Sequence, residues 1–266
     1  MITIKINFWF YLLVLLFLAG LVALLVDVLA CFVFLKKGRR TAYRVLKEKP
    51  IKEFYQEKKA LPNYCCYEDI SDNLKVILVN LEDKTFWKHH GFNLIKTVQA
   101  LLANMIKWEK GRGGSTITQQ LAKNMYFSFE KTFHRKIAEA FVAYELERTL
   151  TKEQILELYL NIVYFGEKMI GIGEACQYYF EKAPADLTVN QAVALCCVIP
   201  GPVRYNPVNP ESAFLKGKRN ALNVLCRRNL FEPKDIDAFM QAGNCVDFNC
   251  DISRKYEEMY QKLSKR

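Results

Sequence analysis

The sequence predicts a mainly α-helical protein with one membrane-spanning segment near its N-terminus. Residues 117–165 and 186–199 carry apolar side chains at helical spacing, and few stretches alternate with the period of a strand. The apolar run at 8–35 is long enough to cross a bilayer. A chain of 266 residues that is 51% apolar can bury a sizeable core, and this length suggests one main domain with an appendage.

The apolar run contains a single ionisable side chain, Asp27. As a helix it is about 42 Å long at about 1.5 Å per residue, which exceeds the roughly 30 Å hydrocarbon core. A cleaved signal peptide has a shorter apolar region, so we expect a single-pass anchor. The expected organisation is a short tail at 1–7, the anchor at 8–35, a charged juxtamembrane linker or helix at 36–60, and the main domain at 61–266.

The formal charge of +10 and the pI near 9.1 suit an anionic partner, either a phosphate-bearing substrate or acidic lipid headgroups. Nucleic acid is disfavoured as a partner, because no basic helix interleaved with aromatics occurs. The nine cysteines are an odd number, so complete intramolecular pairing is impossible. Cys196 and Cys197 lie in an apolar helical run, where we expect them to be small buried side chains.

Start and stop signals place the main helices in order. In the segment 70–81, Ser71 is a cap followed by an apolar run, which predicts a helix that delivers Glu82 at its end. Glycines at 111, 113 and 114 predict a loop, and Ser115 or Thr116 can cap the helix that follows. A TKEQ capping box at Thr151 predicts a helix to about Asn161. The apolar segment 94–108 is expected either in the core or dipping into the bilayer, and the tail from 212 is expected to be helical.

The densest chemistry lies in the decapeptide EDKTFWKHHG at 82–91, which combines an acid pair, two aromatics and two histidines. His89 and His90 lack the i, i+4 spacing of a helical zinc motif. We therefore expect a structural histidine that bonds nearby backbone, with Phe86 and Trp87 packing the loop that holds the acids.

Two polar sets recur at helical spacing. Ser115, Gln119 and Lys123 lie four apart, and with Thr118 and Gln120 they offer neutral donors and one cation to sugar and phosphate oxygens. Lys131, Arg135 and Glu139 also lie four apart, so two cations flank one carboxylate. Taken alone, the first set is equally typical of a capped polar helix start, and the second of a surface salt-bridge ladder.

Five ordered motifs across residues 65–230 resemble the family 51 glycosyltransferases, the peptidoglycan polymerases, and in particular the monofunctional kind without a transpeptidase domain. The motifs are EDKTFWKHHG at 82–91, GGSTITQQLAKN at 113–124, RKIAE at 135–139, ILELYLNIVYFG at 155–166 and AVALCCVIPGPVRYNP at 192–207. The resemblance implies a lysozyme-like, two-lobed helical glycosyltransferase domain at 61–266. Departures from the usual pattern are Asn93, Lys131 and Gln191, which stand where aspartate, arginine and glutamate are common.

The resemblance also implies the reaction: polymerisation of lipid II into glycan strands by inverting glycosyl transfer, with loss of undecaprenyl pyrophosphate. Glu82 is then the general base, and Glu139, the second catalytic acid, orients the cations or holds a divalent metal, Mg or Mn. No organic cofactor is expected. The expected substrate-binding residues are Asp83, Ser115, Thr118, Gln119, Gln120, Lys123, Lys131, Arg135 and Lys136.

The implied partners are lipid II, the growing strand, membrane lipids and other cell-wall synthases, with the domain on the external face of the cytoplasmic membrane. The basic residues that follow the apolar run conflict with that orientation, since positive charge is enriched on the cytoplasmic side. Two alternatives to the polymerase remain: a lysozyme-like enzyme that cleaves glycan, and an inactive membrane-anchored scaffold for wall assembly.

Overall fold

The computed structural model describes residues 2–93, 114–127, 132–207 and 210–241, with the backbone alone for 2–7 and 133. Within these ranges the regular elements are helices, apart from one isolated bridge between Tyr164 and Ile170. The mainly α prediction is therefore confirmed. The segment 94–108, Lys131 and the cysteines at 245 and 250 lie outside the described residues.

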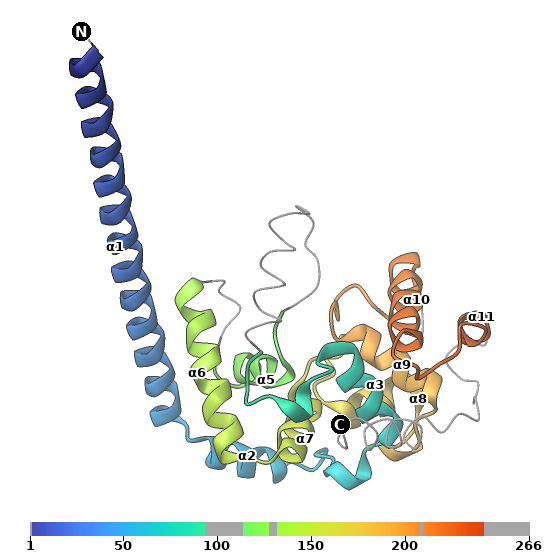
Figure 1. The fold of residues 1–266 in the computed structure, drawn as a ribbon. Coiled ribbons are helices and arrows are strands. Elements are labelled where there is room, and N and C mark those ends of the chain that lie inside the picture. The colour runs from blue at the N-terminus through green and yellow to red at the C-terminus, as the bar shows by residue number, and fades with distance from the viewer. Residues whose placement is uncertain (1, 94–113, 128–131, 208–209, 242–266) are drawn as a thin grey trace.

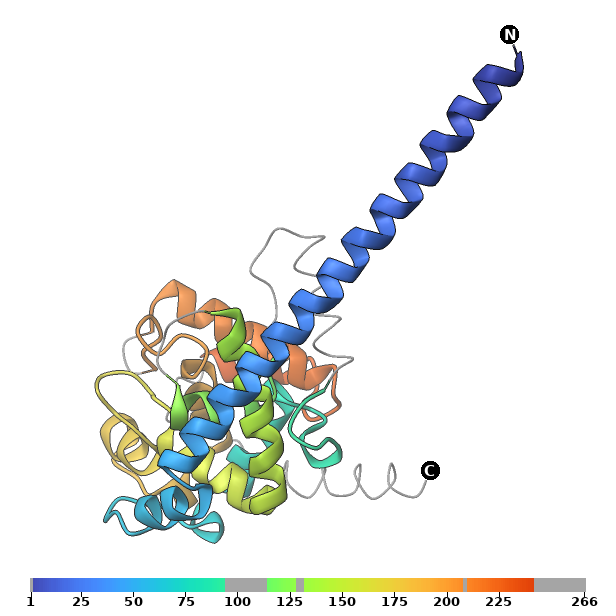
Figure 2. The ribbon, with the colours of Figure 1, turned by 90° about the vertical axis from the view of Figure 1, so that its left-hand side faces the viewer.

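The most extended element is α1 (Ile2–Glu48), which projects from the rest of the protein in two perpendicular views (Figure 1, Figure 2). Its most apolar window is 0% buried and has a mean hydropathy of 3.0, so it is not a core helix. Of the described helices, α1 alone has the length and composition to cross a membrane. It has the properties of the predicted anchor.

Helix α1 extends past both predicted limits of the anchor. It includes residues 2–7, and it continues through the expected linker to Glu48. Pro50 then precedes α2 (Ile51–Lys59). Proline is tolerated at the start of a helix, where the backbone N–H needs no helical partner. Residues 36–60 are therefore largely helical and connect the anchor to the domain.

The domain end of α1 packs along α6 (Phe133–Thr149), as Figure 1 shows. Ala42 on α1 is buried, and Gly38 lies so close to Ile137 that an added Cβ would overlap its side chain. Glycine permits this close approach of two helices because it carries no side chain. The helix that carries Glu139 is thus in direct contact with the extension of the anchor.

Helix α9 (Val189–Val198) lies in the core of the domain, and all its residues are buried, Cys196 and Cys197 included. The burial predicted for these two cysteines is confirmed. Helix α9 packs against α3 (Asp72–Glu82) and α10 (Ser212–Cys226). The remaining elements are η1 (Tyr67–Asp69), η2 (Phe86–Lys88), α5 (Ile117–Tyr126), α7 (Lys152–Ile162), α8 (Ile172–Phe180), η3 (Pro184–Asp186) and α11 (Asp235–Gln241).

Three helices begin with the same capping box. Thr116, Thr151 and Thr188 each accept a hydrogen bond from the backbone N–H of a glutamine three residues later, and that glutamine bonds back. The boxes predicted at Thr151 and the cap at Thr116 are confirmed. Ser71 stands at the start of α3 as predicted, but its side chain makes no capping hydrogen bond.

A buried carboxylate ties α2 to the domain. Glu157 on α7 accepts hydrogen bonds from the hydroxyls of Tyr55 at 2.9 Å and Tyr64 at 2.6 Å, and from the backbone N–H of Tyr67 at 2.9 Å. These donors satisfy the buried charge, as such a group requires. They also fix the segment between α2 and α3, from which α3 carries Glu82 into the site.

Candidate active site

Glu82 is the last residue of α3, half-buried, and a hydrogen-bond chain holds its carboxylate. The side-chain N–H of Gln120 donates to Glu82 Oε2 at 2.8 Å, and the hydroxyl of Tyr159 donates to Gln120 Oε1 at 3.0 Å. Complete burial raises the pKa of the Tyr159 phenol, so this hydroxyl stays a donor. Because its oxygen is occupied, the Gln120 amide presents its N–H to Glu82.

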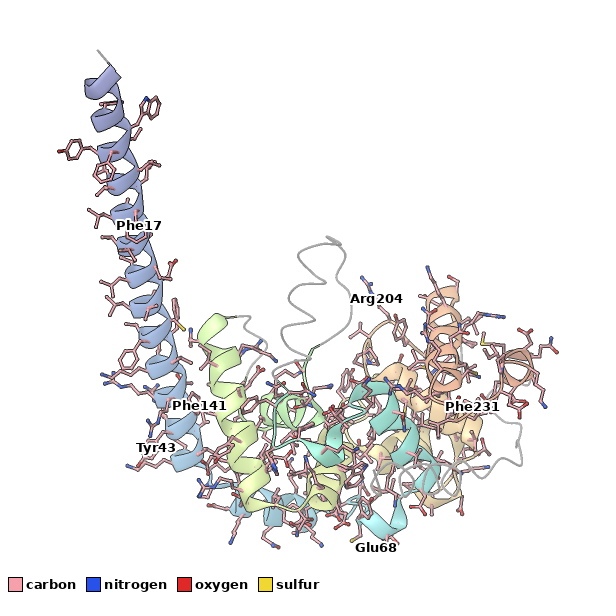
Figure 3. All side chains as sticks on the ribbon, viewed as in Figure 1. Phe17, Tyr43, Glu68, Phe141, Arg204 and Phe231 are labelled. Atoms are coloured by element: carbon pink, nitrogen blue, oxygen red, sulfur yellow. The ribbon has the colours of Figure 1, made fainter. Side chains whose placement is uncertain are left out.

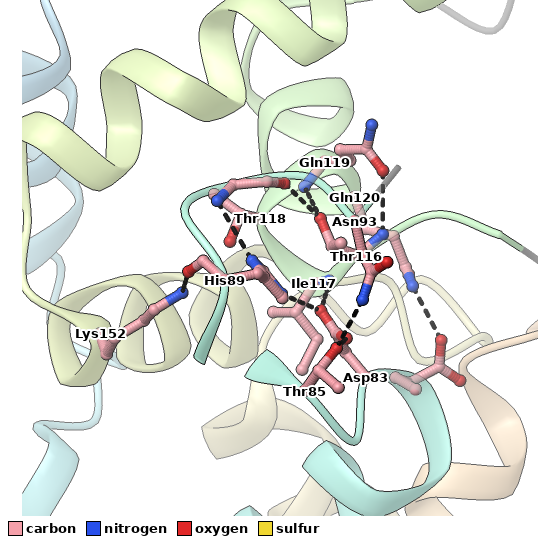
Figure 4. A network of polar contacts seen from close by, with 12 residues as sticks. Asp83, Thr85, His89, Asn93, Thr116, Ile117, Thr118, Gln119, Gln120 and Lys152 are labelled. Carbon is pink, nitrogen blue, oxygen red and sulfur yellow. Dashed lines mark hydrogen bonds and ion pairs between the residues drawn. The ribbon is translucent and has the colours of Figure 1, made fainter. Parts of the chain in front are cut away.

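Asp83, the next residue, points into the protein interior. It is fully buried, and its Oδ2 accepts from His89 Nε2 at 2.7 Å and from the backbone N–H of Ile117 at 3.1 Å (Figure 4). His89 Nδ1 accepts from the backbone N–H of Gly91 at 3.1 Å, so the predicted backbone bond of a structural histidine is confirmed. A carboxylate at the first N–H of α5 is also favourable for the helix dipole. Asp83 thereby holds the start of α5 beside the end of α3.

Behind this contact lies a buried polar network that joins four segments. Glu147 on α6 accepts from Thr118 Oγ1 at 2.6 Å and from Lys152 Nζ at 2.7 Å. Lys152 also donates to the backbone carbonyl of His89 at 2.7 Å and lies 4.5 Å from the centre of the Phe86 ring. Burial lowers the pKa of Lys152, while its bond to Glu147 acts in the opposite direction.

The second acid, Glu139, is fully buried on α6 between two cations. Lys136 Nζ donates to Glu139 Oε2 at 2.8 Å, and Arg135 Nε lies 3.3 Å from Glu139 Oε1. Lys136 also donates to Ser115 Oγ at 2.8 Å, so it links the start of α5 to α6. The predicted flanking of Glu139 by cations is borne out for Arg135, whereas Lys131 lies outside the described residues.

Lys123 on α5 interacts electrostatically with both acids. Burial lowers the pKa of this amine, and its charge feels both Glu139 and Glu82 as well as the cations Lys136 and Arg135. Among the residues that the structure describes, the side-chain amine of Lys123 forms no hydrogen bond or ion pair. A partly desolvated ammonium in this position is available to an anionic ligand.

The structure thus sorts the predicted site residues into two groups. The first consists of residues that interact electrostatically with Lys123, or that hydrogen-bond to those residues: Glu82, Gln120, Ser115, Arg135, Lys136 and Glu139. In the second group, Asp83, Thr118 and Gln119 are buried and bonded to protein groups, Gln119 through the capping box. Direct contact of these three with a substrate stays a prediction.

Three contributors were not singled out from the sequence: Tyr159, Glu147 and Lys152. Each forms a hydrogen bond with a residue 29 to 63 positions away. Lys152 and Glu147 also bond to each other. The available signal was their place in or near the motif at 155–166. A lysine directly after a capping threonine reads as an exposed first-turn residue, which hides the role of Lys152.

The described residues combine a helical domain, a helix long and apolar enough to cross a membrane, and two acids near a partly buried lysine. The chain belongs to the transglycosylase family, since the family model described as Transglycosylase matches residues 47–226. It is 42% identical over 158 residues to penicillin-binding protein 1A of Neisseria lactamica, covering 59% of this chain and 20% of that protein. It is 36% identical over 162 residues to penicillin-binding protein 4 of Bacillus subtilis, covering 58% and 26%. The chain thus matches about a fifth to a quarter of the length of these relatives.

Proposed function

We propose that this protein is a peptidoglycan glycosyltransferase that polymerises lipid II into glycan strands. The observation that carries the proposal is the position of Lys123, a half-buried cation within the electrostatic reach of both Glu82 and Glu139. Such an arrangement has a carboxylate at one end and a set of cations at the other. It suits a reaction in which a proton leaves one partner and an anionic group leaves the other.

Glu82 acts as the general base in this proposal. It takes the proton from the 4-hydroxyl of the acceptor's N-acetylglucosamine as that oxygen forms a bond to the anomeric carbon of the donor. The bond between this carbon and the pyrophosphate oxygen breaks in the same displacement, which inverts the configuration. The Gln120 bond at 2.8 Å to Glu82 Oε2 holds the carboxylate in place for this proton transfer.

The cations on α5 and α6 stabilise the departing undecaprenyl pyrophosphate. Lys123, Arg135 and Lys136 approach Glu139 from two helices, and preorganised cations of this kind lower the energy of a charge that grows in the transition state. Glu139 orients Arg135 and Lys136, whose side chains would otherwise repel each other. Lys131 completes the predicted set but lies outside the described residues.

The residues around Glu139 do not fit a resident divalent metal. Its two oxygens face Lys136 and Arg135, and the described residues include no cluster of three or more acidic, histidine or cysteine side chains. A metal prefers several oxygen ligands and no adjacent cations. We therefore assign Glu139 the role of orienting Arg135 and Lys136. A Mg or Mn ion that takes part in the reaction would bind the phosphates of the substrate.

The anchor supports a substrate and a growing strand held at a membrane, and we place the domain on the external face, where wall polymer accumulates. Other cell-wall synthases are further proposed partners. Glycan cleavage by a lysozyme-like mechanism uses two carboxyl groups but gives no role to the three cations. An inactive scaffold leaves the Tyr159–Gln120–Glu82 chain without a purpose.

The test is turnover of purified lipid II by the full chain in detergent, followed by separation of the glycan products. Long strands are expected from the wild type and none from Glu82→Gln, with unchanged helicity and melting temperature. Turnover retained by Glu82→Gln would remove the base assignment. Release of short fragments from finished glycan, in place of strand synthesis, would favour the cleaving enzyme.

A further inference from the structure

The part of α1 beyond the apolar run has two unlike faces. Gly38, Ala42 and the partly buried Val45 and Leu46 face the domain and pack along α6. The other side carries six exposed cations, here called the α1 basic face: Lys36, Lys37, Arg39, Arg40, Arg44 and Lys47. None of the six forms an ion pair with a described residue, and Glu48 is the one acidic residue between 28 and 48.

The composition of α1 locates this face relative to a bilayer. Four exposed aromatics, Phe8 to Tyr11, occupy the far end of the apolar run, where aromatic belts mark a membrane interface. The 24 residues from 12 to 35 span about 36 Å, which fits a hydrocarbon core of roughly 30 Å at a tilt of about 34°, within the range of membrane helices. Figure 3 shows Phe17 on this span and Tyr43, which is 70% exposed, near the domain end.

Four of the six cations therefore lie at the depth of the lipid headgroups. Lys36 directly follows the apolar run, and Arg40 is five residues past Leu35, or about 7.5 Å along the helix axis. The interfacial layer on each side of a bilayer is roughly 5 to 7 Å thick. Long basic side chains also reach back toward it.

We propose that the α1 basic face binds anionic phospholipid headgroups of the leaflet on the domain side. The headgroup depth favours lipid over an acidic protein, and the charge of the face is complementary to phosphate-bearing headgroups. This proposal also accounts for basic residues on the domain side of the anchor, because their partner is the membrane surface itself. The lipid contact does not depend on the proposed reaction.

The consequence for the active site, which does rest on the proposed function, follows from the Gly38 contact. Gly38 lies against Ile137, and Arg135, Lys136 and Glu139 lie within one turn of Ile137 on α6. Lipid bound to the α1 basic face thereby holds the cation cluster of α6 close to the phosphate layer. The phosphates of a lipid-linked donor lie in that same layer.

The test uses the full chain in phosphatidylcholine proteoliposomes that contain a trace of spin-labelled lipid. Electron paramagnetic resonance gives the association of spin-labelled phosphatidylglycerol relative to spin-labelled phosphatidylcholine. We expect the wild type to prefer the anionic lipid at least about fivefold, the equivalent of one cation near the surface. The preference should approach unity in about 1 M salt, where the Debye length is about 3 Å.

The variant Lys36→Gln, Lys37→Gln, Arg39→Gln and Arg40→Gln is expected to lose this preference. The matched control removes four cations elsewhere, Lys52, Lys168, Lys182 and Arg227, and should retain it. Equal preference in the two variants, or none in the wild type, would overturn the proposal. Lipid II turnover tests the consequence for the active site apart from the lipid contact. The α1 variant should be slower than the control in anionic bilayers and equal to it in detergent. Equal rates of the two variants in both media would refute the positioning of α6.

Discussion

Tyr159→Phe tests whether a buried hydroxyl orients the proposed base. The hydroxyl donates to Gln120 Oε1 at 3.0 Å, and Gln120 Nε2 donates to Glu82 Oε2 at 2.8 Å. Without the hydroxyl, this hydrogen-bond chain no longer fixes which way the Gln120 amide faces. The amide can then turn its oxygen toward the Glu82 carboxylate. The substitution removes a single atom from a fully buried ring and leaves the packing intact.

The expected loss follows from the strength of the second bond. A hydrogen bond to a charged group contributes about 1.5 to 3 kcal/mol. Losing most of it should lower kcat/KM for lipid II about tenfold to a hundredfold, at about 1.4 kcal/mol for each tenfold. Because the Gln120 bond favours the ionised carboxylate, its loss should also move the acidic limb of the pH–rate profile to higher pH. Lys123, Cys196 and Cys197 also interact electrostatically with Glu82, and the substitution leaves them unchanged.

The matched control is Tyr55→Phe, which removes a hydroxyl that donates to buried Glu157 at 2.9 Å on the α2 side of the domain. In urea titrations Tyr159→Phe should lose about 1 kcal/mol, the ordinary value of a hydrogen bond between neutral groups, and Tyr55→Phe about 1.5 to 3 kcal/mol, because its acceptor is a carboxylate. The control should retain both kcat/KM and the position of the acidic limb. A folded Tyr159→Phe protein with the wild-type pH profile would refute the orienting role.

Three further predictions follow from other parts of the site. Gly91→Ala should lower the free energy of unfolding, measured in thermal melts, by about 1 to 3 kcal/mol. Gly91 has a φ of +92°, and a Cβ there would lie 2.8 Å from the carbonyl oxygen of Ala143. The control Gly20→Ala, which has open space around it, should not lower it. Pyrophosphate affinity, measured by calorimetry, should fall as the pH rises through the lowered pKa of Lys123, since the neutral amine loses its attraction, whereas Lys123→Arg should bind independently of pH over that range. Chelation of divalent cations should slow the wild type and Glu139→Gln in equal proportion; a larger effect on the wild type would assign a metal to Glu139.

The elements that the sequence predicted well are those whose signals are local. The capping boxes at Thr116 and Thr151 each depend on residues three apart, and the apolar run before Glu82 determines where α3 ends. The same T-x-x-Q signal was present at Thr188 and caps α9 in the same way. Local hydrogen bonds of this kind depend little on the remainder of the fold.

The residues whose roles were not predicted depend on contacts between distant segments. Asp83 is expected among the substrate-binding residues, yet its carboxylate accepts a hydrogen bond from the backbone of Ile117, 34 positions away. Lys152 reaches the carbonyl of His89, 63 positions away. Spacing within a motif cannot reveal such pairs, because they form only when α5, α6 and α7 pack around the loop after α3.

Contacts between the end of α3 and the start of α5 explain why the site needs both the motif at 82–91 and the motif at 113–124. Asp83 accepts from the backbone N–H of Ile117, the first residue of α5, while Glu82 accepts from the side chain of Gln120 one turn later. Successive helical residues point about 100° apart, so Gln119 can complete the cap at Thr116 while Gln120 turns toward Glu82. The bond that positions Glu82 and the bonds that hold the start of α5 thus come from adjacent residues on each side: Glu82 and Asp83 at the end of α3, and Gln119 and Gln120 on α5. A shift of α5 relative to α3 therefore disturbs Glu82 even when every proposed substrate contact remains in the chain.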